Sequence, residues 1–243
     1  MSNPRIYQTG DFNVGSNTPL SDDAFGHVVR VLRLKAGDEV TLFNGDGHDY
    51  QAVLTEVSKK QARVNITSKE FIANESPLNI HLGQGISRGD RMDFTLQKSV
   101  ELGVNTITPL FTERCGVKLN AERLEKKRQQ WQKIVISACE QSGRAVVPQV
   151  LAPVAIAEWL HQPSEALKIN LHPRAEHSIM GLPMSTNRVR LLIGPEGGLS
   201  EQEINDASDA NYTEVLLGLR VLRTETAALT AITALQCKFG DLG

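Results

Sequence analysis

Cysteine is scarce in this chain of 243 residues, which contains only Cys115, Cys139 and Cys237. Their number is odd, their spacing is wide and no Cys-x-x-Cys pair occurs. A disulfide framework and a cysteine zinc site are therefore not expected, and no metal is predicted. Reduced, buried thiols are the expectation, as in cytosolic proteins.

Long apolar runs are also lacking. No stretch approaches the roughly 20 residues that a membrane helix needs. The first five residues, from Met1 to Arg5, are polar and lack the apolar core of a signal peptide. These absences predict a cytoplasmic protein without a membrane partner.

A strong charge of either sign is missing too, because the formal net charge is −2. Hydrophobic residues make up 40% and charged residues 22%, which is ordinary for a globular protein and argues against disorder. Total charge therefore does not indicate a nucleic-acid partner. Local basic clusters can still face phosphate, and they occur in five places: 30–35, 59–63, 88–91, 123–128 and 220–223.

The first 72 residues are predicted to form a small β-rich domain. A short helix over 21–34, with Ser21 as N-cap, precedes strands at 39–43, 50–57 and 62–66. The Asn44-Gly45-Asp46-Gly47 stretch is typical of a turn. Several short strands with one helix suggest a small barrel, and the polar stretch 71–77 reads as a linker.

Residues 73–243 are predicted to form a second domain of the α/β class. Apolar strands are expected at 78–85, 106–111, 167–171, 189–193 and 214–217. Helical periodicity is found at 90–102, 120–141, 200–207 and 224–239. Strands that alternate with helices favour a parallel sheet covered by helices.

A glycine-rich loop runs from Ile193 to Ser200 between a buried strand and a helix. Ser200 and Glu203 form a capping-box pattern, which predicts a helix from about residue 201. Three glycines in five residues let the backbone approach a ligand at the carboxyl end of the sheet. A tight turn without a ligand is the alternative that spacing alone leaves open.

The commonest nucleotide motifs are absent from this loop. It has neither the Gly-x-x-x-x-Gly-Lys pattern of a phosphate loop nor the Gly-x-Gly-x-x-Gly pattern of dinucleotide folds. A weaker Gly83-Gln84-Gly85 follows a predicted strand, but no third glycine accompanies it. We interpret that triplet as a strand end or bulge.

A second loop, from Leu217 to Glu225, joins the last predicted strand to the last helix. Thr224 is its candidate N-cap, and Glu225 suits the helix dipole. Arg220 and Arg223 are three residues apart in this short loop, so they can converge on one anionic ligand. Solvated surface positions are the alternative for both arginines.

Taken together, seven motifs in this order resemble the SPOUT methyltransferases, and within them the ribosomal RNA small-subunit methyltransferase E family. The resemblance spans essentially the whole chain and is carried by residues 27–33, 97–104, 113–114, 140–144, 170–173, 193–200 and 217–227. One departure is Leu219, where close relatives are expected to have proline, which bears on the rigidity of that loop.

The resemblance implies S-adenosylmethionine as cofactor and 16S rRNA in the 30S subunit as substrate partner. Family members methylate N3 of one uridine, uracil 1498 in 16S numbering. The resemblance further implies a deep trefoil knot in the C-terminal domain, an N-terminal PUA-like β-barrel that binds RNA, and a homodimer. Composition and periodicity do not predict the knot.

The resemblance also suggests which residues form the site. The predicted cofactor-binding residues are Leu171, His172, Ile193, Gly194, Glu196, Gly197, Gly198, Leu217, Gly218, Val221 and Leu222. Arg223 or Arg220 is predicted to stabilise negative charge on the uracil oxygens. Glu196 or Glu225 is the candidate base, although Glu225 can equally act only as a helix-start charge.

RNA contacts are predicted for five arginines: Arg30, Arg33, Arg88, Arg114 and Arg144. Several polar residues at motif positions have two open interpretations, namely dimer or target-base contacts and ion pairing within the fold. These are Gln97, Glu101, Arg114, Glu140 and Arg144.

Two other classes of protein compete with this hypothesis. One is a non-catalytic RNA-binding or ribosome-assembly protein with an inactive cofactor fold, which the intact glycines in both loops disfavour. The other is a nucleotide-dependent enzyme that binds phosphate at residues 194–198, which the missing phosphate-loop lysine disfavours.

Overall fold

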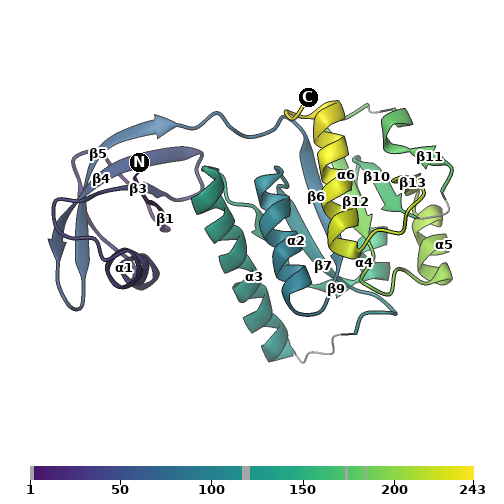
Figure 1. Ribbon diagram of the computed structural model, residues 1–243, viewed down its shortest axis with the longest axis horizontal. Helices are drawn as coiled ribbons and strands as arrows, with labels where there is room; N and C mark the ends of the chain where they lie inside the picture. The colour runs from purple at the N-terminus through teal and green to yellow at the C-terminus, as the bar shows by residue number, and fades with distance from the viewer. Residues whose placement is uncertain (1–2, 117–120, 173–174, 184) are drawn as a thin grey trace. The chain divides into compact units, whose positions relative to one another are not determined.

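The computed structural model describes residues 3–116, 121–172, 175–183 and 185–243. The chain divides into two compact units (Figure 1). The first comprises Met1–Glu75 with Cys139–Val147, and the second Ser76–Ala138 with Pro148–Gly243. The sequence-based boundary at residues 72 and 73 did not include the return segment Cys139–Val147. Backbone carbonyls hold that segment to the first unit: Arg5 Nη1 donates to the carbonyl of Cys139 at 2.7 Å.

The first unit is a mixed five-stranded sheet with the order β1-β3-β4-β5-β2. Its strands are β1 (Arg5–Tyr7), β2 (Asn17–Pro19), β3 (Glu39–Phe43), β4 (His48–Val57) and β5 (Ala62–Phe71). β1 pairs parallel with β3, and the other pairings are antiparallel. At the two edges, the buried side chain of Gln8 donates to the carbonyl of Pro19 and accepts from the amide of Ser21. This side chain links the ends of the edge strands, which gives the sheet a barrel-like closure.

The first unit has a hydrophobic core of its own, formed largely by alternate residues of β3, β4 and β5 such as Val40, Leu54 and Val64. The predicted helix after Ser21 is confirmed in part: α1 (Asp22–Phe25) is an α-helix with Ser21 as N-cap. It continues as a π-helix over Gly26–Val31. The strand β5 extends through Phe71, which the sequence interpretation had placed in the linker.

The second unit is built on an eight-stranded sheet with the order β11-β13-β10-β12-β6-β7-β8, in which β9 also pairs with β7. The strands are β6 (Asn79–Gly85), β7 (Thr106–Phe111), β8 (Gln149–Val150), β9 (Val154–Ala155), β10 (Leu167–Leu171), β11 (His177–Ser178), β12 (Arg188–Ile193) and β13 (Thr213–Leu216). Every described pairing is parallel, as the alternation of strands and helices predicted.

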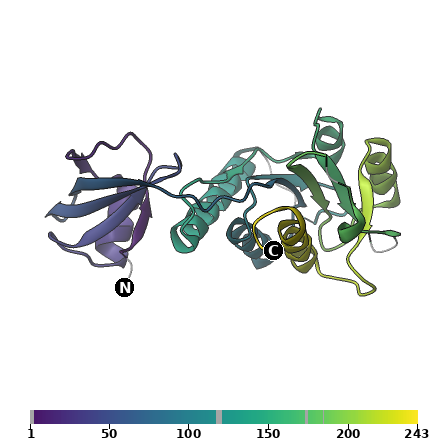
Figure 2. The same cartoon turned by 90° about the horizontal axis from the view of Figure 1, so that it is seen from above.

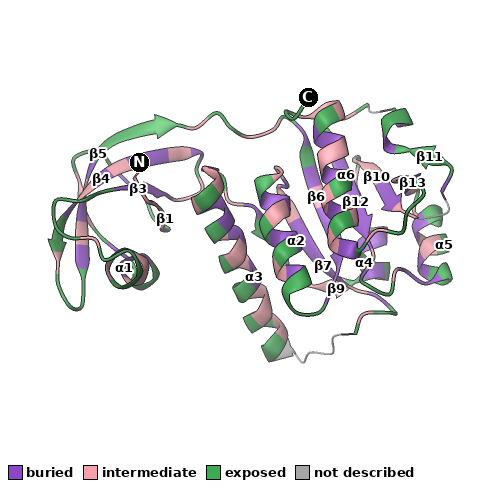
Figure 3. Ribbon diagram, viewed as in Figure 1, coloured by how far each residue is buried: buried purple, intermediate pink, exposed green. Residues whose placement is uncertain are grey.

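Helices cover both faces of this sheet (Figure 2). α2 (Asp90–Glu101) packs against α6 (Thr224–Phe239) on one face, while α4 (Ile156–His161) packs against α5 (Glu201–Asp209) on the other. The long helix α3 (Ala121–Ser142) runs from the second unit into the first. Buried residues concentrate on the strands and the inward stripes of the helices, whose outer stripes are exposed (Figure 3). This pattern is the one expected when amphipathic helices bury one face against a sheet.

The short elements β8, β9, β11 and α4 were not predicted, because two to six residues are too few for a periodic signal. The motif residue Pro173 and the predicted helix start at Asn120 lie outside the described residues.

Within the described ranges, no helix has both the length and the apolar character to cross a membrane. The same ranges hold no cluster of three His, Cys, Asp or Glu side chains suited to a metal.

Candidate functional site

A cavity of about 640 Å³ opens at the carboxyl ends of β10, β12 and β13. It is bounded by the glycine loop Gly194–Gly198 after β12 and by the loop from Leu217 to Arg223 before α6, which we call the arginine loop. The structure places at this cavity every residue that the sequence assigned to the cofactor: Leu171, His172, Ile193, Gly194, Glu196, Gly197, Gly198, Leu217, Gly218, Val221 and Leu222. The four candidate catalytic residues, Arg223, Arg220, Glu196 and Glu225, line it as well.

The glycine loop is tightly built. The amide of Gly198 donates to the carbonyl of Pro195 at 2.8 Å, and Gly198 has a φ of 68°, which favours glycine. The predicted capping box is confirmed: the Ser200 hydroxyl accepts from the amide of Glu203, and the Glu203 carboxylate accepts from the amide of Ser200. The end of the loop is therefore fixed to the start of α5.

The Gly83-Gln84-Gly85 triplet at the end of β6 serves packing, in line with its interpretation as a strand end. A Cβ on Gly83 would lie 2.5 Å from the Trp159 ring, and one on Gly85 would lie 2.5 Å from the Pro195 nitrogen. Both glycines leave room for a neighbour, and the second lets β6 approach the glycine loop closely.

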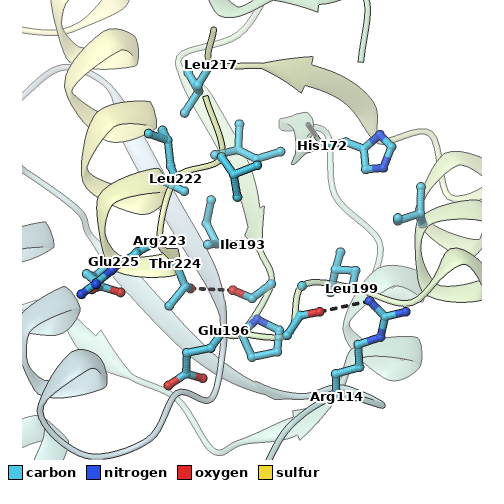
Figure 4. Close-up of a pocket in the computed structure, with 18 of the residues that line it drawn as sticks. Arg114, His172, Ile193, Glu196, Leu199, Leu217, Leu222, Arg223, Thr224 and Glu225 are labelled. Atoms are coloured by element: carbon cyan, nitrogen blue, oxygen red, sulfur yellow. Dashed lines mark hydrogen bonds between the residues drawn. The ribbon is translucent and has the colours of Figure 1, made fainter. Parts of the chain in front are cut away.

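The arginine loop turns at Gly218, which has a φ of 84°. Leu219 and Val221 are 95% and 90% exposed, and Arg220 and Arg223 are exposed beside them. The expectation that Thr224 caps α6 is wrong: Arg223 occupies the N-cap position and Thr224 is the first helical residue. The Thr224 hydroxyl instead donates to the carbonyl of Gly194 at 2.6 Å, which joins the two loops (Figure 4).

Glu196 is held by two arginines of the α2 region. Its Oε1 accepts from the amide of Arg88 at 2.9 Å and from Arg91 Nη1 at 3.2 Å. Burial alone raises the pKa of this carboxyl, but the hydrogen bonds from Arg88, from its own amide and from Arg91 outweigh burial. The pKa of Glu196 therefore lies below its ordinary value, and the side chain is a stable anion.

Glu225 differs from Glu196 in its contacts. Its Oε2 is buried and has no hydrogen-bond partner among the described residues. On the opposite side of the cavity, His172 Nδ1 lies 3.2 Å from Glu214 Oε2. Of the two candidate bases, Glu196 is thus a tethered carboxylate, and Glu225 is a carboxylate with one unpaired oxygen among the described residues.

Of the predicted RNA contacts, Arg88 and Arg114 are exposed near this cavity. Arg114 Nη1 donates to the carbonyl of Gly197 at 3.0 Å (Figure 4). Arg30 and Arg33 are exposed in the first unit, where Arg33 has a φ of 58°. Arg144 is only 5% exposed, and its Nε donates to Glu75 at 2.9 Å.

Among the remaining polar motif residues, one is exposed and the others pair with neighbours in the fold. Gln97 is exposed, and Glu101 pairs with Lys98 at 2.7 Å. Glu140 accepts from the amide of Tyr7 at 3.0 Å within the first unit. For Glu101, Glu140 and Arg144, the geometry is that of ion pairing and hydrogen bonding within the fold, one of the two interpretations left open.

Sequence reasoning gave no role to two residues that shape the site, one on the cavity wall and one behind it. Arg91 lines the cavity, yet in the sequence it is one arginine in a predicted helix. Gln84 is completely buried and donates to Thr224 at 3.0 Å, a contact between residues 140 positions apart. The only available signal was a polar residue inside an apolar strand.

Comparison with protein families agrees with the motifs. Residues 74–236 match the RNA methyltransferase domain, and residues 20–67 match the RNA methyltransferase PUA domain. Ribosomal RNA small subunit methyltransferase E of Buchnera aphidicola subsp. Schizaphis graminum is 42% identical over 240 residues, which is 98% of each chain. The protein of that name from Bacillus subtilis is 31% identical over 227 residues, covering 89% of this chain and 88% of the relative.

Solved structures match equally well. A methyltransferase from Legionella pneumophila in complex with the cofactor SAM shares 46% identity with a TM-score of 0.97 over 100% of both chains. A ribosomal RNA small subunit methyltransferase E from Neisseria gonorrhoeae, bound to S-adenosyl methionine, shares 44% identity with a TM-score of 0.93 over 100% of both chains. The resemblance identified from the sequence motifs is thus confirmed, and the chain belongs to the ribosomal RNA small subunit methyltransferase E family of RNA methyltransferases.

Proposed function

We propose that this protein transfers a methyl group from S-adenosylmethionine to N3 of one uridine, uracil 1498 of 16S rRNA, in the small ribosomal subunit. The observation that carries the proposal is the single cavity edge at which the glycine loop, the arginine loop and the end of β10 meet. Family membership supports the rRNA substrate, and the cofactor found in the Legionella and Neisseria relatives supports the methyl donor.

The residues of the cavity fit this cofactor. A volume of about 640 Å³ is adequate for a ligand of nucleoside size. The glycines at 194, 197 and 198 keep side chains away from the ligand, while Ile193, Leu217 and Leu222 supply apolar walls. When bound, S-adenosylmethionine supplies a methyl group on a positively charged sulfur, so no metal is required for the transfer. We therefore propose that all eleven predicted cofactor residues hold it.

Uridine N3 carries a proton at neutral pH, so the enzyme has to stabilise the anion that forms as the proton leaves. Arg223 is the stronger candidate for this role. It stands at the N-cap of α6, a helix of 16 residues, where the helix dipole disfavours a cation. A residue placed against local stability is typical of a functional site. Arg220 is the alternative, because it lines the same cavity.

Of the two candidate bases, we favour Glu225. Glu196 accepts two hydrogen bonds and its pKa is lowered, which makes it a weaker base. Glu225 has one carboxylate oxygen without a hydrogen-bond partner in the described part of the chain, so that oxygen is free to accept a proton. We expect Glu225→Gln to slow methyl transfer to 30S subunits about a hundredfold, and Glu196→Gln to slow it less. A wild-type rate in Glu225→Gln would remove Glu225 from this role.

Substrate RNA is proposed to contact two regions. Arg88 and Arg114, exposed near the cavity, would bind phosphates that flank the target base. Arg30 and Arg33 of the PUA domain would contact phosphates elsewhere in the rRNA. Arg144 remains the weakest of the predicted RNA contacts, because it is buried against Glu75.

Three further features follow from the family. We propose that the chain around residues 193–224 forms a trefoil knot. After β12 the chain crosses β10 to form β13, and α6 then returns to pack on β12 and α2, which is the kind of path that threading requires.

We propose a homodimer, supported by the exposed apolar side chains of Leu219 and Val221. We also propose that the protein acts in the cytoplasm, where small ribosomal subunits are found.

The experiment that tests the function compares rRNA from a strain with and without this gene. Mapping of modified nucleosides by mass spectrometry is expected to find one N3-methyluridine in 16S rRNA only when the gene is present. An unchanged set of methylated uridines would overturn the substrate assignment. Calorimetric titration with S-adenosylmethionine separately distinguishes an enzyme from a non-catalytic RNA-binding relative, which would not bind the cofactor.

A further inference from the structure

We propose that Gln84 is a positioning residue that ties the glycine loop to the arginine loop and thereby sets the affinity for the cofactor. The inference rests on the proposed function, because the cofactor is the one assigned there. Gln84 belongs to neither loop and does not line the cavity. Its effect therefore has to pass through the residues that it holds.

The contacts of Gln84 form a short chain of hydrogen bonds. Gln84 lies near the end of β6, in register with Ile193 of β12, and is completely buried. Its Nε2 donates to Oγ1 of Thr224 at 3.0 Å and to the carbonyl of Gly85 at 3.0 Å. The Thr224 hydroxyl then donates to the carbonyl of Gly194 at 2.6 Å (Figure 4).

The chemistry of the three groups fixes the direction of this chain. A hydroxyl has one proton, and that of Thr224 is used on the Gly194 carbonyl, so Thr224 has only lone pairs to offer Gln84. The Gly85 carbonyl is also an acceptor. The NH₂ group of an amide donates to two acceptors at once without adding a buried charge, whereas an apolar residue or a carboxylate at position 84 has no proton for either acceptor.

Stability alone does not explain a glutamine at this position. Its Oε1 is buried and has no hydrogen-bond partner among the described residues, and a buried polar atom without a partner costs free energy. An unbranched apolar side chain of similar length would avoid that cost. A polar residue kept at a cost inside an apolar strand indicates a role in the neighbouring site.

The position of Thr224 explains how these hydrogen bonds affect the cavity. Thr224 directly follows Arg223 and begins α6, while Gly194 is the first residue of the glycine loop. The link therefore holds both walls of the cavity in place before a ligand enters. Preformed walls reduce the ordering cost of binding, so the link should appear as cofactor affinity.

The test uses the full-length protein with two near-isosteric variants, Gln84→Met and Thr224→Val, and their double mutant. Calorimetry with S-adenosylmethionine is expected to give about tenfold weaker binding for each single variant, the loss expected for one link between the loops. Because both act on the same link, the double mutant should also lose about tenfold rather than about a hundredfold. Thr224→Ser, which keeps the hydroxyl, is expected to bind S-adenosylmethionine with the wild-type affinity.

Gln236→Met is the matched control. Gln236 is equally buried and hydrogen-bonds to Ser76 and to the Leu102 carbonyl, but it does not line the cavity. It should lower the melting temperature about as much as Gln84→Met while leaving the dissociation constant at the wild-type value. Equal loss of affinity in Gln236→Met, or multiplicative losses in the double mutant, would overturn the proposal.

A second readout separates this inference from the proposed function. Hydrogen exchange of the backbone amides of Gly194 and of residues 196–198, measured without ligand, is expected to be faster in Gln84→Met and Thr224→Val than in the wild type. If the wild type does not bind S-adenosylmethionine, the proposed function fails, and exchange still decides the link. Equal exchange in all three proteins would show that Gln84 does not hold the loop.

Discussion

Replacing Gly85 by alanine should displace the glycine loop of the cofactor site, because Gly85 lies at the end of β6 and packs directly against that loop. An added Cβ would lie 2.5 Å from the nitrogen of Pro195 and 2.9 Å from the carbonyl carbon of Gly194. Ordinary contacts of a Cβ begin near 3.4 Å, so the loop has to retreat by about 0.9 Å. Both neighbours are backbone or ring atoms and cannot rotate away.

The expected magnitude follows from that displacement. Overpacking of this kind costs about 2 kcal/mol, which lowers the melting temperature of a chain of this size by about 4–8 °C. A shift of about 1 Å in a positioning loop costs about a hundredfold in catalysis. Because the displaced loop also forms a wall of the cofactor cavity, the dissociation constant of S-adenosylmethionine, measured by calorimetry, is expected to rise about tenfold or more.

Gly181→Ala is the control for Gly85→Ala, since a Cβ there meets no atom within 4 Å and the residue lies outside the cavity. It should leave both the melting temperature and the dissociation constant unchanged. Wild-type affinity in Gly85→Ala would refute the conclusion that the close approach of β6 shapes the glycine loop.

Three other predictions test different parts of the molecule. Arg223→Ala should lower methyl transfer to 30S subunits about a hundredfold more than it weakens cofactor binding, and full turnover would exclude the arginine as charge stabiliser. Charge reversal of Arg30 and Arg33 should make the slope of log K for RNA binding against log salt concentration shallower by about 0.7–0.9 for each lost phosphate contact, while cofactor affinity stays constant. An unchanged slope would count against both residues. Burial raises the pKa of Cys139 to about 12, so at pH 8 its thiol is protonated and should react with a thiol reagent only after unfolding. The exposed Cys237 should react in the native protein, and mass spectrometry that finds rapid labelling of Cys139 would contradict its burial.

Much of the fold could be predicted because the second unit has long periodic elements. The strand at 106–111, the strand at 167–171 and the helix at 224–239 have the predicted bounds. The capping box at Ser200 and Glu203 was also correct, since both partners are three residues apart in the sequence. Local signals of this kind depend only on neighbouring residues.

Contacts between distant segments were beyond the reach of the same signals. Thr224 was expected to cap its own helix, because a threonine before a helical run is typical of an N-cap. Its hydroxyl instead bonds to Gly194, 30 positions earlier, since β12 and α6 meet at the cavity. The burial of Arg144 against Glu75, 69 positions away, could not be seen for the same reason.

The candidate site shows both levels of inference. Glycine spacing predicted a ligand cradle at the carboxyl ends of the strands, and the cavity lies there. The identity of the ligand came from the order of seven motifs. The difference between Glu196 and Glu225 came only from the structure, because it depends on the hydrogen bonds from Arg88 and Arg91.

The most direct test of the account is methyl transfer by the purified protein. Small ribosomal subunits that lack the modification are incubated with S-adenosylmethionine carrying a labelled methyl group, and the nucleosides of 16S rRNA are then separated and identified by mass spectrometry. The account predicts label in N3-methyluridine at a single position, uracil 1498. Label in any other nucleoside, or no label in 16S rRNA, would contradict it.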